Sequence, residues 1–131
     1  MGNARSFKYY SLSGKEKNKV VNLIRGILSK EKHVLLAIIY ESFVELSSFR
    51  DIDIAVYSLN TTLSYLVELA VKIEEKVKIP IDIVPINDLS TKFKQYVLTR
   101  GLVVFERTPG LYEALLSQAT DELILMEKLS N

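Results

Sequence analysis

Short apolar segments alternate with longer segments of helical periodicity along this chain, and this alternation limits its possible folds more than any other feature. Apolar segments suited to strands cover residues 34–40, 49–58, 79–86 and 102–107. Segments with helical spacing of apolar residues cover residues 13–32, 60–77, 87–101 and 108–129. The predicted order α-β-β-α-β-α-β-α favours an α/β (α+β) fold, in which helices pack on a mixed β-sheet of about four strands.

Capping residues mark several ends of these segments. Asn60 is the predicted N-cap of the second helix. Gly101 is predicted to end the third helix as its C′ residue. Thr108 and Pro109 are the predicted N-cap and first residue of the last helix. The segment between the first two strands, residues 41–50, is predicted to be a plain connection.

The length and composition predict one globular domain. The chain has 131 residues, of which 48% are hydrophobic and 25% are charged, as in an ordinary globular protein. A chain of this length buries roughly two-thirds of its unfolded surface, so a full core is available. The polar residues 1–12 are predicted to form a flexible arm, and residues 13–131 a single domain.

Charge and residue content exclude several kinds of site. A net charge of +1, from 17 basic and 16 acidic residues, gives no electrostatic footprint for nucleic acid or an anionic membrane. The lack of cysteine excludes disulfides and thiolate metal sites, and the single histidine, His33, excludes a zinc site built from several histidines. The longest apolar run is too short to cross a bilayer, and the N-terminus lacks the apolar part of a secretory signal. We therefore expect a cytoplasmic protein without a membrane partner.

Three aspartates interrupt the predicted strands. Asp51 and Asp53 stand two residues apart in FRDIDIAVYS, and Asp82 stands alone in IPIDIVPI. Because side chains alternate between the faces of a strand, Asp51 and Asp53 share one face, while Ile52 and Ile54 share the other. Three carboxylates converging on one sheet face would repel one another, and Mg²⁺, which prefers such oxygen ligands, would relieve the repulsion. A solvated sheet face for the pair and a turn for Asp82 are the alternative.

The surroundings of these acids resemble the nucleotidyltransferase superfamily. Ser42 stands in ESF, a connection follows, and then come DID, a helix and IDIV. The superfamily's signature is a Gly-Ser pair, a short connection, an acid-x-acid pair and a third acid on a later strand. The stretch IDIVPINDLSTKFKQYVLTRGLVVFER is also similar to that family's strand, helix and final strand. Over roughly residues 16–128 the chain resembles the minimal nucleotidyltransferases of prokaryotes, stand-alone domains often encoded beside a HEPN-domain partner.

The resemblance implies a role for each of these residues. Asp51, Asp53 and Asp82 would hold Mg²⁺, as one ion or a pair, and Asp82 would also help to activate an acceptor hydroxyl. Ser42 would help to hold the nucleotide's phosphates, and Arg50 would contact a phosphate or form a surface salt bridge. The implied reaction moves a nucleoside monophosphate, AMP from ATP, onto a hydroxyl group. A HEPN-type toxin is the implied acceptor, which would make this chain an antitoxin.

The chain departs from the family's pattern around Ser42. Glu41 stands where the family has a glycine, which lets the backbone approach the phosphates closely. The second glycine and the basic residue of the family pattern are also missing, and Glu45 and Leu46 stand near their places. Two hypotheses follow from this departure. The chain is either an enzyme of the implied kind, or a catalytically degenerate nucleotidyltransferase fold that neutralises or scaffolds a partner.

Two helical surfaces remain after this assignment. The first predicted helix carries a group of lysines, which predicts a solvated helix face or, alternatively, a phosphate contact. These lysines are at positions 15, 17, 19, 30 and 32. The last predicted helix carries an apolar stripe, of which one part is expected to pack on the sheet and a surplus to form a homodimer or partner surface. This stripe consists of Leu111, Leu115, Leu123, Ile124 and Met126.

Overall fold

The structure is a computed structural model that describes residues 8–130 and contains a four-stranded mixed sheet. The strands are β1 (Tyr10–Ser11), β2 (Val34–Tyr40), β3 (Ser48–Phe49), β4 (Ile52–Ser58), β5 (Ile81–Pro85) and β6 (Leu102–Glu106). The helices are α1 (Gly14–Ser29), α2 (Ser42–Glu45), α3 (Leu63–Val77), the 3₁₀ helix η2 (Ile86–Asp88), α4 (Thr91–Arg100) and α5 (Leu111–Leu129).

The order of strands in the main sheet is β5-β4-β2-β6. β2 runs antiparallel to both β4 and β6, whereas β4 runs parallel to β5. Parallel neighbours need a long crossover, and α3 supplies it between β4 and β5. The predicted fold class, a mixed sheet of about four strands with helices packed on it, is confirmed.

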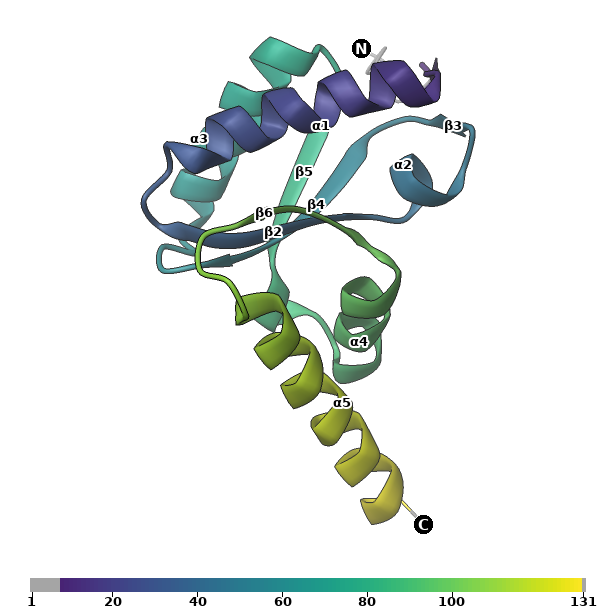
Figure 1. The fold of residues 1–131 in the computed structure, drawn as a ribbon, viewed down its shortest axis with the longest axis vertical. Helices are drawn as coiled ribbons and strands as arrows, with labels where there is room; N and C mark the ends of the chain where they lie inside the picture. Colours follow the sequence, from purple (N-terminus) through teal and green to yellow (C-terminus); the bar gives the residue numbers. More distant parts are fainter. Residues whose placement is uncertain (1–7, 131) are drawn as a thin grey trace.

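Helices cover both faces of this sheet, with α1 and α3 on one face and α4 and α5 on the other (Figure 1). The alternation along β4 matches this arrangement. Ile52, Ile54 and Val56 pack in the core beneath α1 and α3, whereas Ala55 and Tyr57 pack beneath α4 and α5. The side-chain period of two therefore assigns each residue of β4 to its layer, as the sequence predicts.

β6 lies at one edge of the sheet, and α1 covers part of its outer side. The Arg25 Nε donates a hydrogen bond of 2.8 Å to the Val104 carbonyl oxygen. Its Nη1 donates a second one, of 2.6 Å, to Oδ1 of Asn22, one turn earlier in α1. The guanidinium group thus occupies a carbonyl that β6 would otherwise present at the free edge.

The helices begin at side-chain caps, although not always at the predicted residue. Ser13 and Glu16 form a reciprocal capping box at the start of α1. The N-cap of α3 is Thr62, whose hydroxyl accepts from the Tyr65 N–H, so the prediction of Asn60 is wrong. The Asn60 carboxamide oxygen instead accepts from the Thr62 N–H, which turns the chain into the helix two residues later.

α5 starts later than predicted, because the turn before it is longer. Its N-cap is Gly110, with φ 93°, rather than Thr108, whose carbonyl accepts from the Leu111 N–H. Pro109 is consequently a turn residue and not the first residue of the helix. Within residues 8–130, neither α5 nor any other helix has the length and apolar character needed to cross a membrane.

Short elements replace two segments that the sequence predicts to be irregular. Residues 1–7 of the predicted arm lie outside the described residues, but Tyr10–Ser11 form β1, which pairs antiparallel with β3. The Tyr10 ring stacks on that of Phe49, with centroids 6.0 Å apart. The predicted connection at 41–50 contains α2 and β3. This correction reflects the burial of Phe43 and Phe49, whose rings lie 5.0 Å apart.

Gly101 ends α4 in an extended conformation, with φ −75° and ψ 167°. It is the C-cap, and the prediction of a C′ residue, which is usually left-handed, is wrong. A Cβ atom at Gly101 would overlap the Ile38 side chain and lie 2.5 Å from the Val97 carbonyl oxygen. The glycine is needed because α4 and β2 approach each other closely at this point.

Gly101→Ala should lower the free energy of unfolding by about 1–3 kcal/mol. The added methyl group would overlap the Val97 carbonyl oxygen of α4 and the Ile38 side chain of β2, and neither element can move away. The matched control is Gly26→Ala in the middle of α1, where nothing lies within 4 Å of an added Cβ. The control should raise the free energy of unfolding by up to about 1 kcal/mol through helix propensity. Denaturant titration measures both, and equal stabilities for the two variants would contradict the steric account.

Candidate active site

Asp53 lies near the start of β4, between two neighbouring strands. It is paired with Tyr40 of the antiparallel β2 and with Asp82 of the parallel β5. Because paired residues on adjacent strands point to the same side, the three side chains share one face of the sheet. Ala55 places this face on the side of α4 and α5. Asp51 stands just before the strand begins.

Negative charge accumulates around Asp53. Its carboxyl group is half-buried, and burial is the largest cause that raises its pKa, to about 7. The neighbouring charges of Asp51, Glu41 and Asp82 raise the same pKa further. The structure therefore brings Asp51 and Asp82, together with Glu41, within electrostatic reach of Asp53.

Tyr40 faces the same group of acids from β2 and is almost fully buried. Burial, and then the charge of Asp53, raise the pKa of the Tyr40 hydroxyl far above its ordinary value. The neutral phenol is thus strongly favoured. Its ring packs edge-on against Phe93 of α4, with centroids 5.7 Å apart. Tyr40 thereby connects the acids to α4.

Glu41 has the backbone conformation of a glycine. Its φ is 61° and its ψ is −133°, values that a residue with a Cβ rarely adopts. Its carbonyl oxygen accepts from the N–H groups of Val44 and Glu45, at 3.0 and 2.9 Å, which starts α2. The chain therefore keeps the sharp turn after β2 although the residue that would make it easily is absent.

Lys17 holds the turn after β2 in place from α1. Its Nζ donates to the carbonyl oxygens of Phe43 and Leu46, at 2.7 and 3.0 Å. It also lies 5.1 Å from the centre of the Phe43 ring. These contacts give Lys17 a structural role, as they use the carbonyl groups at the end of α2. The alternative of a phosphate contact for the lysines of α1 gains no support from this residue.

Ser42 and Arg50 stand at the two ends of the segment that contains α2 and β3, next to Glu41 and Asp51 respectively. Ser42 is the first residue of α2, directly after Glu41, and is partly exposed. Arg50 is exposed beside Asp51, and its guanidinium carbon lies 5.7 Å from the centre of the Tyr9 ring. Both residues stand near the acids, and a phosphate-binding role for either of them stays a prediction.

Sequence reasoning missed a row of side chains on α4. Phe93 and Tyr96 stack with centroids 5.5 Å apart, and the Arg100 guanidinium lies 5.8 Å from the centre of the Tyr96 ring. The Tyr96 hydroxyl donates a 2.6 Å hydrogen bond to Glu45, which raises its pKa and ties α4 to α2. The spacing of these residues, three and then four, is the signal that places them on one helix face.

The carboxylates suit a divalent cation in ligand type and in charge. Within residues 8–130, no three acidic or histidine side chains lie close enough to form a complete metal site by themselves. The oxygen ligands are nevertheless those that Mg²⁺ prefers, usually together with water and substrate phosphates. The raised pKa of Asp53 also indicates negative charge that the protein's own groups do not compensate. A cation with additional ligands from a nucleotide fits this arrangement.

Comparison with protein families identifies this arrangement. The model of the family described as "Polymerase beta, Nucleotidyltransferase" matches residues 22–109, which is more than half of the chain. The chain belongs to this nucleotidyltransferase family. The matched range contains the turn at Glu41, the acid pair and Asp82. No curated protein sequence matches this nucleotidyltransferase domain significantly.

Solved structures of toxin–antitoxin complexes contain chains similar to this nucleotidyltransferase domain. One such structure is a tri-AMPylated HEPN toxin from Shewanella oneidensis in complex with MNT antitoxin. The similar chain has a TM-score of 0.62 and 24% sequence identity, and the match covers 87% of this chain and 88% of that chain. The structure of the toxin–antitoxin MntA-HepT gives a TM-score of 0.63 and 23% sequence identity, and the match covers 88% of this chain and 91% of that chain. A structure of a toxin–antitoxin with AMP-PNP gives a TM-score of 0.65 and 25% sequence identity, and the match covers 86% of this chain and 90% of that chain. These similarities show a shared fold.

Asp53→Asn should make the metal-free protein more stable at pH 8 by about 1–2 kcal/mol. The gain is smaller than the raised pKa alone implies, because solvent screens part of the charge of this partly exposed carboxyl group. The pKa of Asp53 is raised on folding, so its contribution to stability is complete below its ordinary pKa and is lost as the pH rises through about 7. The advantage of the variant should therefore disappear near pH 4. Thermal unfolding with a chelator measures it, and Asp88→Asn, an exposed site on η2, is the control. A less stable variant at pH 8 would mean that Asp53 is a structural hydrogen-bond acceptor.

Glu41→Gly should raise the free energy of unfolding by about 1 kcal/mol, because glycine adopts φ 61° and ψ −133° without strain. Glu41→Ala is the matched control, since it removes the carboxylate but keeps the Cβ. Denaturant titration at low and high salt compares the two. If alanine stabilises the protein as much as glycine does, the charge of Glu41 and not its backbone is unfavourable.

Proposed function

We propose that this chain is a Mg²⁺-dependent nucleotidyltransferase that moves AMP from ATP onto a hydroxyl group of a HEPN-type toxin and so acts as its antitoxin. The observation that carries the proposal is the pairing of Asp53 with Asp82 on parallel strands, beside the turn at Glu41 and Ser42. Membership of the nucleotidyltransferase family supports the reaction type. The similar chains in complexes with a tri-AMPylated HEPN toxin and with AMP-PNP support the acceptor and the nucleotide. The cytoplasm, where ATP is available, is the proposed location.

Three aspartates would hold the metal in this proposal. Asp51, Asp53 and Asp82 would bind Mg²⁺, which supplies neutralisation of the phosphate charge when it is present. The negative charge that raises the pKa of Asp53 would then be compensated. Because Asp53 is half-buried while Asp82 is exposed at the edge strand, Asp82 is the carboxylate that an acceptor group from another protein reaches most easily.

The transfer itself breaks a phosphoanhydride bond of ATP and forms a phosphoester bond to the acceptor. The acceptor oxygen forms a bond to the α-phosphorus of ATP, and the bond from that phosphorus to the β-phosphate oxygen breaks. Pyrophosphate leaves, and the acceptor hydroxyl gives its proton to Asp82, which is the general base in this proposal. Ser42 would hold the phosphates with its hydroxyl group, and Arg50 would contact them from the other side of the acids.

Glu41 favours a second function, in which the chain binds a HEPN-type partner but catalyses no transfer. The Glu41 carboxylate stands next to Ser42 and adds negative charge to a place where phosphates would bind. A chain of this kind would neutralise a HEPN-type partner by binding alone. The two hypotheses differ in whether nucleotide binds and whether the partner gains mass.

Calorimetry and mass spectrometry on the same proteins separate these functions. Wild type should bind Mg·ATP about ten- to a hundredfold more weakly than Glu41→Gly, because one like charge near the phosphates opposes binding and the metal screens only part of it. Both should transfer AMP to a co-expressed HEPN-type partner, faster in Glu41→Gly. Asp53→Asn should transfer none, whereas Asp88→Asn should match wild type.

Two results would change the conclusion. Tight binding of Mg·ATP by wild type, unchanged or weakened in Glu41→Gly, would show that Glu41 is harmless or a ligand. A partner that is bound but never modified, by wild type or by Glu41→Gly, would leave the binding function as the correct one.

A further inference from the structure

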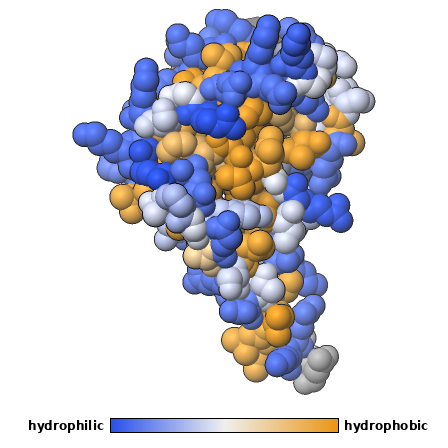
Figure 2. Space-filling model, in the orientation of Figure 1, coloured by the Kyte–Doolittle hydropathy of each residue, from blue (hydrophilic) through white to orange (hydrophobic). Residues whose placement is uncertain are grey.

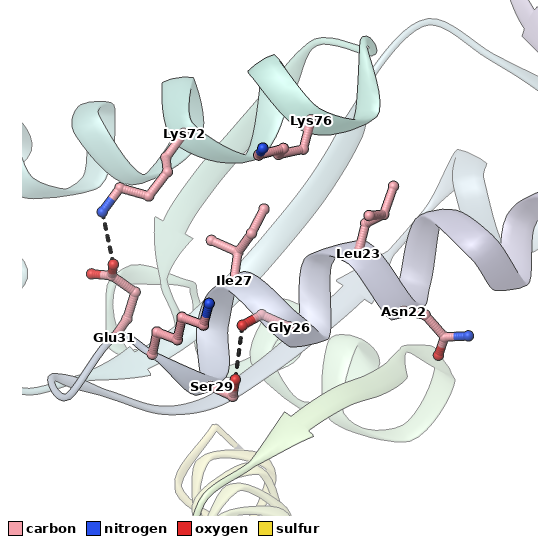
Figure 3. A pocket seen from close by; sticks show the side chains of 9 residues that line it. Asn22, Leu23, Gly26, Ile27, Ser29, Glu31, Lys72 and Lys76 are labelled. Carbon is pink, nitrogen blue, oxygen red and sulfur yellow. Dashed lines mark hydrogen bonds and ion pairs between the residues drawn. The ribbon is translucent and has the colours of Figure 1, made fainter.

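A groove between α1 and α3 lies on the face of the sheet opposite to the acids. It has a volume of about 610 Å³ and is open to solvent. Figure 3 shows Leu23 and Ile27 pointing from α1 toward α3, with Lys72 and Lys76 on the facing helix. The sheet lies between this groove and the candidate active site, so the proposed reaction makes no use of the groove.

Gly26 forms part of the floor of this groove, and nothing within the chain requires a glycine there. It lies in the middle of α1, where glycine is less favourable than alanine, and no atom lies within 4 Å of an added Cβ. One turn away, Leu23 has 46% of its surface exposed. A bare backbone beside an exposed leucine permits another helix to approach α1 closely.

The rim of the groove is positively charged. Lys30, Lys72 and Lys76 line it together with one acid, Glu31, which pairs with Lys72 at 2.8 Å. Within residues 8–130 the structure gives the ammonium groups of Lys30 and Lys76 no ion pair or hydrogen bond. The groove therefore favours an occupant that is apolar along its centre and acidic at its sides.

The outer face of α5 has this pattern. Asp121, Leu125 and Leu129 follow one another at intervals of four residues and share one helix face, with Glu122 beside them. Leu125 and Leu129 are 57% and 77% exposed. Figure 1 shows that this half of α5 extends away from the rest of the molecule, and Figure 2 shows apolar surface near its end.

We propose that two copies of this chain form a dimer in which α5 of each copy lies in the groove between α1 and α3 of the other. Leu125 and Leu129 would cover the apolar floor at Gly26, and Asp121 would face Lys76. A two-fold arrangement makes this contact twice, so that each copy's exposed end of α5 lies in the groove of the other copy. One contact thus accounts for the glycine, the lysines without partners and the apolar end of α5.

Blocking variants test the apolar part of the contact. Wild type should sediment as a dimer at micromolar concentration, whereas Gly26→Leu and Leu125→Glu should dissociate about tenfold more easily or more. Gly26→Leu adds a side chain that occupies the groove, and because no atom lies within 4 Å of an added Cβ, the fold should be kept. Leu46→Glu replaces a leucine that is 57% exposed at the end of α2, outside α5 and outside the lining of the groove, and this control should remain dimeric.

A charge exchange tests the polar part. Lys76→Glu and Asp121→Lys should each weaken the dimer about tenfold, and the double variant should recover most of the loss, because the exchanged charges face each other again. Lys92→Glu on α4 is the control and should behave as wild type. Circular dichroism confirms that each variant is folded.

Three results would overturn this proposal. They are a wild type that stays monomeric at high concentration, a dimer that Gly26→Leu leaves intact, and a double charge variant without recovery. A groove that binds a HEPN-type partner, with loss of that binding in Gly26→Leu and no self-association, would assign the same surface to a different protein.

Discussion

The parallel pairing of β4 with β5 is the constraint on which the candidate site depends. It aligns Asp53 with Asp82, and the antiparallel β2 brings Tyr40 to the same residue from the other side. Such a half-buried carboxylate among like charges opposes folding, as its raised pKa indicates. The arrangement persists because the core beneath α1 and α3, on the opposite face, is apolar and closely packed. The face that carries the acids has a smaller apolar cluster beneath α4 and α5, so the site lies beside one core and opposite to the larger one.

Features that depend on local pattern could be predicted from the sequence, whereas features that depend on contacts between distant segments could not. The alternation along β4 assigned Ile52 and Ile54 to one layer correctly. The N-cap of α3 was misplaced because Asn60 and Thr62 are both good caps, and their mutual hydrogen bond decides between them. The role of Gly101 depends on how closely β2 passes, which no local pattern contains.

The candidate site shows the same division. The aspartates are visible in the sequence because an acid is unusual in a strand. Tyr40 and Tyr96 are not visible, because an aromatic residue in an apolar strand or on a helix is usually a core residue. Their place beside the acids depends on strand register and on the packing of α4. The departure at Glu41 was found through the family resemblance, but only the structure reveals its positive φ.

The hydrogen bond from Arg25 to Val104 has a consequence for how copies of this protein meet. An unpaired edge strand is a template on which further strands add, and this addition leads to fibrous aggregates. On β6 the guanidinium group takes a carbonyl that an incoming strand would need. On β5, at the other edge, Pro85 has no N–H to offer. With both edges poor templates for strand addition, the helix surfaces are the favoured places for any association of copies.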